Sequence, residues 1–172
     1  MNEQDEYKHI SAKEFSYLEN SKYRYVWTDG NNEIFQHFYL ITENYYSSIV
    51  GGEEKRKAFI PYNLSSCVEE VLLVFFEDTP VACSCLKRYS EYDVEIKRVW
   101  VEPEHRGNHI AGTMMKILED KAKKSGYRRM ILQTREIMKD AVRLYLNIGY
   151  SKTDNYPPYD KLEGAVCFAK KL

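Results

Sequence analysis

The segment from Val101 to Gly112 has the residue types of an anion-binding loop. Arg106 and Gly107 lie between a predicted strand and the first turn of a predicted amphipathic helix. Unpaired backbone N–H groups and the positive end of the helix dipole converge at such a helix start, and a pyrophosphate fits this geometry. The glycine spacing matches neither the P-loop GxxxxGK[ST] nor the dinucleotide-binding GxGxxG. The segment therefore predicts a pyrophosphate site that belongs to neither of these two classes.

The strand before this loop, residues 94–101, does not alternate cleanly between apolar and polar side chains. Val94 and Ile96 share one face and Glu95 lies on the other, but Arg98 places a charge where the apolar face should continue. A β-bulge reconciles the pattern, because one inserted residue shifts the facing of the residues after it. Pairing with the next strand would then be disrupted, and an extended ligand could bond to the freed backbone groups.

Periodicity, capping residues and turn residues predict one α/β (α+β) domain with a mixed, mostly antiparallel central sheet flanked by helices. An antiparallel meander comes first, β-α-β crossovers follow, and the bulge lies in the fourth strand. The first long helix starts at Asp29 or Asn31 and ends at Gly51, with an apolar stripe of Ile34, Phe38, Ile41, Tyr45 and Ile49. The other expected elements are strands 22–27, 68–77, 81–88, 94–101, 130–134 and 165–170 and helices 108–124 and 137–147.

Composition argues against several classes of protein. The 25 Lys and Arg residues balance 26 Asp and Glu residues, which gives no electrostatic argument for binding nucleic acid or an anionic membrane. The charged N-terminus argues against a signal peptide, and no apolar run approaches the ~20 residues of a membrane span. The four cysteines follow neither a metal-binding nor a disulfide-scaffold pattern, so we expect buried free thiols and a cytoplasmic location.

The run from Glu95 to Gly112, EIKRVWVEPEHRGNHIAG, resembles motif A of the GNAT N-acetyltransferases, written [QR]xxGx[GA]. Arg106 and Ala111 match its first and last positions. His109 stands where the family usually has glycine, and its side chain could crowd a pyrophosphate unless its Cβ points outward.

A second segment, AVRLYLNIGY from Ala141 to Tyr150, resembles the family's motif B, AxxLYxxxG[FY], in the expected order and at the expected distance. Met138 stands where the family often has asparagine. The resemblance covers about residues 22–172, which leaves residues 1–21 as an N-terminal extension.

The resemblance implies an acetyl-CoA-dependent enzyme that needs no metal. It places Tyr145 as the proton donor to the departing thiolate and Glu95 as the general base for the acceptor amine. The bulged strand would splay from its neighbour and bond to the pantetheine arm through Val99 and Val101. The pyrophosphate would contact the Arg106 side chain and the backbone amides of Gly107, Asn108, His109, Ile110, Ala111 and Gly112.

Each assignment has a structural alternative. Tyr145 could simply pack on the sheet, and Glu95 could form an ion pair with Lys97 or Arg98. His105 and His109 suggest a metal, but no third ligand lies nearby in the sequence. The whole domain could also be a CoA-binding sensor or interaction module that has lost efficient catalysis.

The acceptor is expected to be a primary amine of a small molecule or a peptide. A polyamine or aminoglycoside would favour an acidic cleft, for which Glu43, Glu53, Glu54 and Glu69 are available, whereas a protein N-terminus or lysine is equally compatible. Four aromatic residues in the segment that usually shapes the acceptor site could line it or pack ordinarily: Tyr45, Tyr46, Phe59 and Tyr62. Homodimers are common in the family, but no residues in the sequence identify an interface.

Overall fold

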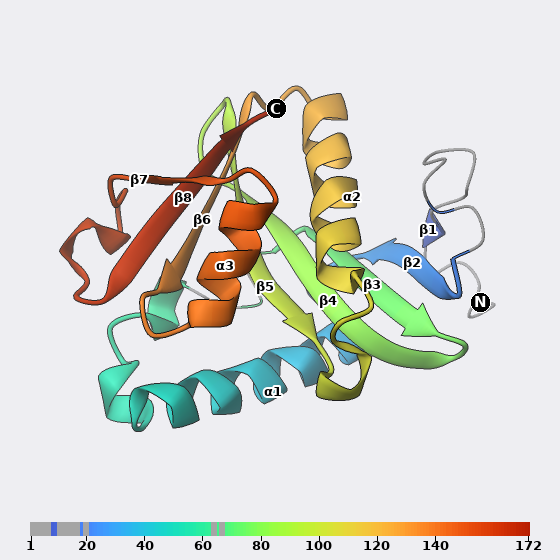
Figure 1. The fold of residues 1–172 in the computed structure, drawn as a ribbon, viewed down its shortest axis with the longest axis horizontal. Coiled ribbons are helices and arrows are strands. Elements are labelled where there is room, and N and C mark those ends of the chain that lie inside the picture. Colours follow the sequence, from blue (N-terminus) through green and yellow to red (C-terminus); the bar gives the residue numbers. More distant parts are fainter. Residues whose placement is uncertain (1–7, 10–17, 19–20, 63–64, 66–67) are drawn as a thin grey trace.

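The computed structural model describes residues 8–9, 18, 21–62, 65 and 68–172. The described strands form one eight-stranded sheet in the order β1-β2-β3-β4-β5-β6-β8-β7 (Figure 1). The strands are β1 (Lys8–His9), β2 (Tyr23–Thr28), β3 (Glu70–Phe76), β4 (Thr79–Arg88), β5 (Asp93–Val101), β6 (Arg129–Arg135), β7 (Ser151–Thr153) and β8 (Ala165–Lys171). Only the β5–β6 pair of this sheet is parallel. The predicted α/β fold with a mixed, mostly antiparallel sheet is thus confirmed.

The helices α1 (Glu33–Val50), α2 (Ile110–Lys124) and α3 (Lys139–Asn147) cover the two faces of the sheet. α2 and α3 pack on one face and α1 on the other (Figure 1). The alternation of β3 shows why both faces are apolar: Leu72 and Val74 join the cluster under α2, whereas Leu73 joins the cluster over α1. Burying one such side chain contributes about 1.5–3 kcal/mol.

The structure moves several predicted boundaries. β4 starts at Thr79 instead of Val81, α2 starts at Ile110 instead of Asn108, and α3 starts at Lys139 instead of Ile137. The helix starts are later because His109 and Met138 adopt non-helical backbone angles as N-caps. The short strand β7 was not predicted at all, since three residues are too few to show an alternating pattern.

The first long helix is present, with a corrected N-cap and a corrected buried face. Asn32, rather than Asp29 or Asn31, accepts hydrogen bonds from the backbone N–H groups of Ile34 and Phe35. Gly51 ends the helix with φ +83°, as expected for a C-terminal glycine. The fully buried residues are Phe35, Phe38 and Thr42, and Ile34, Ile41 and Tyr45 of the predicted stripe are only partly buried.

Residues 1–21 were predicted to be an extension outside the domain. Within them, β1 pairs with β2 and Leu18 is buried in the main core. The other residues up to 20 lie outside the described part of the chain, so the domain boundary stays a prediction.

The predicted bulge in β5 is confirmed at Arg98. Cys85 pairs with Lys97 and Cys83 with Trp100, so two residues of β5 stand opposite one residue of β4. Arg98 adopts φ +58°. The bulge reverses which face of the sheet the side chains of β5 point to. Ile96 and Trp100 are four residues apart and would share a face in a regular strand. Instead, Ile96 belongs to the core under α2 and α3, and Trp100 belongs to the core over α1.

Beyond the bulge, β5 and β6 separate. They pair only from Asp93 to Ile96, and a bidentate contact between Asp93 and Arg129 closes this end, with N···O distances of 2.9 and 2.7 Å. β6 continues to Arg135, but there it pairs with β8 alone. The disrupted pairing expected from the sequence is therefore present and opens a gap between the two strands.

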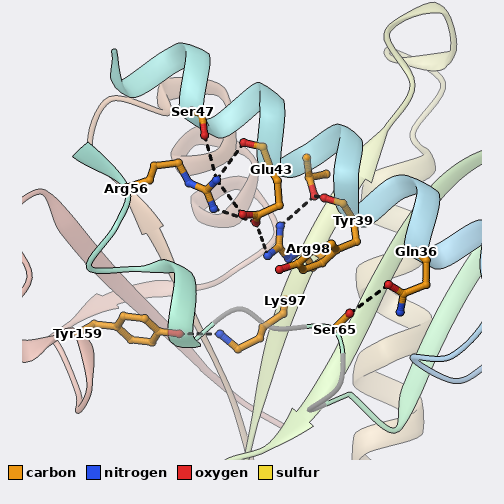
Figure 2. Close-up of polar contacts among 10 residues, drawn as sticks. Gln36, Tyr39, Glu43, Ser47, Arg56, Ser65, Lys97, Arg98 and Tyr159 are labelled. Carbon is orange, nitrogen blue, oxygen red and sulfur yellow. Dashed lines mark hydrogen bonds and ion pairs between the residues drawn. The ribbon is translucent and has the colours of Figure 1, made fainter. Parts of the chain in front are cut away.

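A buried ion network fixes the bulge to α1. The Arg98 guanidinium contacts Glu43 Oε1 at 2.6 Å and donates to Thr42 Oγ1 at 2.9 Å, and it lies 4.3 Å from the centre of the Tyr39 ring (Figure 2). Arg56 donates to both Glu43 carboxylate oxygens, at 2.9 and 2.8 Å. Burial alone would raise the pKa of Glu43, but hydrogen bonds and charges from the two arginines outweigh it, and the pKa is lowered.

Glu43→Gln should destabilise the protein by about 3 kcal/mol, because it leaves two buried guanidinium groups without their counter-charge. For a domain of this size that corresponds to a fall in Tm of roughly 6–12 °C. Thermal unfolding at pH 7 measures it. Glu53→Gln, at an exposed position in the loop after α1, is the control and should leave Tm nearly unchanged.

The same pair of proteins tests the pH dependence. Since the folded pKa of Glu43 is lowered, its stabilisation is present above the unfolded value of about 4.3 and is lost as the pH falls through the folded value. The difference in unfolding free energy between the wild type and Glu43→Gln should therefore shrink below about pH 4. A difference that stays constant from pH 7 to pH 3 would contradict this account.

Candidate functional site

The loop between β5 and α2 presents backbone N–H groups to solvent. After a short 3-10 turn at Pro103–His105, the chain turns at Gly107 (φ +78°) and His109 (φ +59°) into the first turn of α2. The first helical bond runs from the Thr113 N–H to the His109 carbonyl. No side chain caps the helix at His109, and residues 106–109 are exposed. The N–H groups of residues 110–112 therefore have no acceptor within the helix and can bind an anion.

Gly112 leaves space at this helix start. It lies within α2 with no left-handed backbone, and a Cβ built on it would meet no protein atom within 4 Å. A glycine in a helix costs roughly 0.5–1 kcal/mol relative to alanine, so the packing of the described residues gives no reason for it. The missing Cβ suits the close approach of a ligand instead.

Arg106 joins the loop to the strand end. Its Nε donates to the Val101 carbonyl at 2.9 Å, and its guanidinium lies 4.9 Å from the centre of the Trp100 ring. Val101 is one of the two residues predicted to bond to the pantetheine arm, and its carbonyl oxygen thus already accepts one hydrogen bond. This internal contact of Arg106 was not expected from the sequence.

A cavity of about 110 Å³ lies where β5 and β6 separate. The end of α1, the loop after it and α3 complete its wall. It brings together residues that are far apart in the sequence: Tyr46, Ile49, Val50, Arg56, Phe59, Ile96, Lys97, Arg98, Val99, Gln133, Thr134, Arg135, Met138, Ala141 and Tyr145. Val99 and Tyr145 from the predicted site are among them, and so is Met138.

Tyr145 reaches the cavity from α3, one helical turn after Ala141. After the end of this helix, the chain turns at Gly149, which adopts φ +91°. The Tyr145 side chain is buried, and burial raises its pKa, with a further contribution from Tyr46. The phenol is therefore protonated at neutral pH and can act as a proton donor.

Glu95 does not line this cavity. Its carboxylate lies 3.3 Å from Lys97 Nζ and accepts a hydrogen bond from the Tyr156 hydroxyl at 3.0 Å. Lys97 Nζ in turn donates to the Tyr159 hydroxyl at 2.6 Å (Figure 2). Burial lowers the pKa of Lys97, although the Glu95 charge opposes the shift. The ion pair foreseen as the structural alternative for Glu95 is therefore formed, and its role as a base stays a prediction.

Sequence reasoning missed the cations of the cavity. Arg56 and Arg135 carry no motif, and each is brought to the wall by its place in the fold. Glu43, one of the acidic residues considered for a cationic acceptor, is engaged by two arginines, and the other three acidic residues do not line the cavity. Of the four aromatic candidates, Tyr46 and Phe59 line it.

The other two aromatic candidates pack elsewhere, Tyr45 on Trp100 and Tyr62 on Tyr159, with ring centroids 5.0 and 6.2 Å apart. Three cysteines, Cys83, Cys85 and Cys167, are buried free thiols as expected, while Cys67 lies outside the described residues.

The described residues contain no group of three or more His, Cys, Asp or Glu side chains placed to hold a metal ion. Within the same part of the chain, no helix is both long enough and apolar enough to cross a membrane.

The left-handed backbone at His109 gives a stability prediction. A non-glycine residue there costs up to about 1–2 kcal/mol, so His109→Gly should be more stable than His109→Ala by about 1 kcal/mol. Thermal unfolding of the two variants measures the difference. The neighbouring pair Asn108→Gly and Asn108→Ala, at a position without positive φ, is the control and should show no advantage for glycine. Equal behaviour of both pairs would mean that φ at His109 is not left-handed.

Comparison with known proteins is consistent with this geometry. The model of the acetyltransferase (GNAT) family matches residues 12–150. A protein assigned as N-acetyltransferase 14 of Xenopus tropicalis is 32% identical over 84 residues, which cover 48% of this chain and 41% of that protein. The matched segments span between 26% and 42% of the curated relatives.

Solved structures share the fold. A protein of Klebsiella pneumoniae assigned as an acyl-CoA N-acyltransferase has a TM-score of 0.72 at 20% identity and covers 87% of this chain and 97% of its own. A GNAT acetyltransferase of Elizabethkingia anophelis with acetyl-CoA bound has a TM-score of 0.55 at 22% identity and covers 66% of this chain and 82% of its own. Because the family model matches well over half of the sequence, and the bulged, splayed strand and the glycine loop are both present, the chain belongs to the GNAT acetyltransferase family.

Proposed function

We propose that this protein transfers an acetyl group from acetyl-CoA to a primary amine by direct attack of the amine on the thioester. The observation that carries the proposal is the cavity at the separation of β5 and β6, which has the protonated phenol of Tyr145 in its wall. Family membership supports an acyltransferase reaction, and the acetyl-CoA bound to one structural neighbour supports the donor.

The described residues fit acetyl-CoA at two places. The uncapped N–H groups at the start of α2, next to the space left by Gly112, suit the pyrophosphate. The edge of β5 beyond Ile96, which β6 does not pair with, suits the amide groups of the pantetheine arm. We assign the pyrophosphate contacts to the exposed Arg106 guanidinium and to the amides of residues 107–112, and the pantetheine contacts to Val99 and Val101.

In this proposal, the side chains of Tyr145 and Glu95 transfer the protons of the reaction. Tyr145 donates a proton to the departing thiolate, and a backbone N–H of the bulged strand near Val99 polarises the carbonyl oxygen. Reference pKa values of about 10 for tyrosine and about 8.5 for a thiol make the transfer uphill by roughly 2 kcal/mol. Burial raises the pKa of Tyr145, and burial of a thiol raises the pKa of the thiol in the same direction. Glu95 is the proposed acceptor of the amine proton through a water.

Tyr145→Phe should lower kcat by roughly 10- to 100-fold, because general-acid assistance contributes on the order of 10²-fold. The acetyl-CoA dissociation constant should stay within about twofold, because the ring and its packing are kept. Thiol release and calorimetry measure the two quantities. Tyr150→Phe is the control, since Tyr150 is buried on the same core but does not line the cavity. Equal losses of binding and turnover in Tyr145→Phe would refute the proton-donor role.

Gly112→Ala should act in opposite directions on the free and the bound protein. The free protein gains up to about 0.5–1 kcal/mol, which is a rise of roughly 1–4 °C in Tm, because alanine favours the helix and meets no neighbour. Acetyl-CoA binding weakens, because the new methyl group occupies the space next to the helix N-terminus. Thermal unfolding with and without acetyl-CoA measures both effects. A variant that gains stability and binds as the wild type does would remove Gly112 from the site.

A second candidate function is a CoA-binding sensor without efficient catalysis. Two observations favour it: His109 replaces the glycine of motif A with an exposed side chain in the anion loop, and Met138 places a thioether in the cavity wall. Acetyl-CoA at a hundred times its dissociation constant should add about 2.7 kcal/mol of stability, or roughly 5–10 °C in Tm. Such a shift without thiol release across a broad panel of amines would favour the sensor, and no shift at all would exclude both functions.

A further inference from the structure

The cavity wall is rich in positive charge. Four of the residues that line it have cationic side chains: Arg56, Lys97, Arg98 and Arg135. None of the described residues that line it is acidic, and Glu43 and Glu95, which contact Arg98 and Lys97, are not among the lining residues. This charge distribution is opposite to the acidic cleft that a polyamine or an aminoglycoside would need.

Arg56 and Arg98 share a single carboxylate. Oε1 of Glu43 lies 2.8 Å from Arg56 and 2.6 Å from Arg98, and both arginines are buried (Figure 2). One negative charge thus faces two guanidinium groups. Both arginines also line the cavity, where the surrounding protein screens charge less than water does.

Arg135 adds a further positive charge at the end of β6. Its guanidinium stacks on the Phe59 ring at 4.6 Å, and Nη1 lies 3.5 Å from the Lys55 carbonyl oxygen. Among the described residues, Arg135 forms no ion pair. Burial and the nearby charge of Arg56 lower its pKa. Stacking on Phe59 fixes the plane of the guanidinium, so that its N–H groups point in defined directions.

We propose that the acceptor is an amine that also carries an oxyanion, either a carboxylate or a phosphate, and that Arg135 binds this group beside Arg56. The inference rests on the proposed function, because it names the substrate class of the same cavity. A planar guanidinium binds a carboxylate or a phosphate through two parallel hydrogen bonds, which also orients the rest of the molecule. Anchored in this way, the amine is directed toward Val99 and Tyr145, which line the same cavity.

The chemistry of the transfer is unchanged by the anchor. The amine nitrogen forms the new C–N bond, the thioester C–S bond breaks, the amine loses one proton to a base, and the thiolate gains one from Tyr145. The oxyanion stays bound throughout and takes no part in bond making. Its contribution is to hold the amine in place, and it should therefore appear in KM rather than in kcat.

Matched amines test the proposal by thiol release. Phenylalanine is compared with phenylalaninamide, and phosphoethanolamine with ethanolamine, so that each pair differs in the oxyanion. Spermidine serves as the polycation. The wild type should prefer at least one oxyanion-bearing member by roughly tenfold or more in kcat/KM, the size expected for a lost charged hydrogen bond. The pair that shows the preference separates carboxylate from phosphate.

Variants assign the preference to Arg135. Arg135→Gln should raise KM for the preferred acceptor roughly tenfold, leave its kcat nearly unchanged, and leave the uncharged amine unaffected. Arg135→Lys should retain part of the preference, because it keeps the charge but not the planar fork. Arg143→Gln, on the exposed side of α3, is the control. Equal use of the two members of both pairs, or a preference that survives in Arg135→Gln, would overturn the inference.

A binding measurement keeps the test independent of turnover. Calorimetry with saturating CoA compares N-acetylphenylalanine and N-acetylphosphoethanolamine with N-acetylphenylalaninamide, on the wild type and on Arg135→Gln. Binding of an anionic product that disappears in Arg135→Gln supports the oxyanion site even if no amine releases thiol, in which case only the proposed transferase activity fails. Equal binding of the neutral and anionic products, or no binding of any of them, would contradict the oxyanion site. The thiol-release assay would then still decide whether the protein is a transferase.

Discussion

The ion network between Arg98 and Glu43 is the interaction on which the rest of the site depends. Arg98 holds a left-handed backbone, which costs a non-glycine residue roughly 1–2 kcal/mol. The buried contacts with Glu43, Thr42 and Tyr39 compensate this cost. They also attach α1 to the bulge, so that the helix, the bulged strand and the cavity form one unit.

The bulge has two consequences that together create the cleft. It reverses the facing of β5, so that the strand continues to present apolar side chains to both cores. It also coincides with the end of pairing to β6 after Ile96, while Asp93 and Arg129 hold the other end closed. The two strands therefore separate, and Tyr145 of α3 lines the cavity between them.

The net charge of the chain is close to zero, but several of its positive charges gather at the candidate site. At one end of the site, the start of α2 offers a partial positive charge from unpaired amides. The cavity is lined by three arginines, Arg56, Arg98 and Arg135, and by none of the described acidic residues. In the proposed function, backbone groups bind the acetyl donor, whereas side chains of α1, the loop after it and β6 select the acceptor.

Sequence alone determined the features that arise from local backbone physics. The break in alternation at Arg98 predicted the bulge, and the 3.6-residue period predicted the helices. Arg106 and Gly107 predicted a turn from a strand into a helix start, and the structure has this turn. Hydrogen bonding and facing in these features follow from neighbours along the chain. Only the tertiary structure decided which charges meet. Arg56 and Arg98 converge on Glu43 from a loop and a strand, Glu95 pairs with Lys97 and the distant Tyr156, and Arg135 reaches the cavity at the end of β6. A charged residue has many possible partners in the sequence, and the folded arrangement of the elements selects one of them.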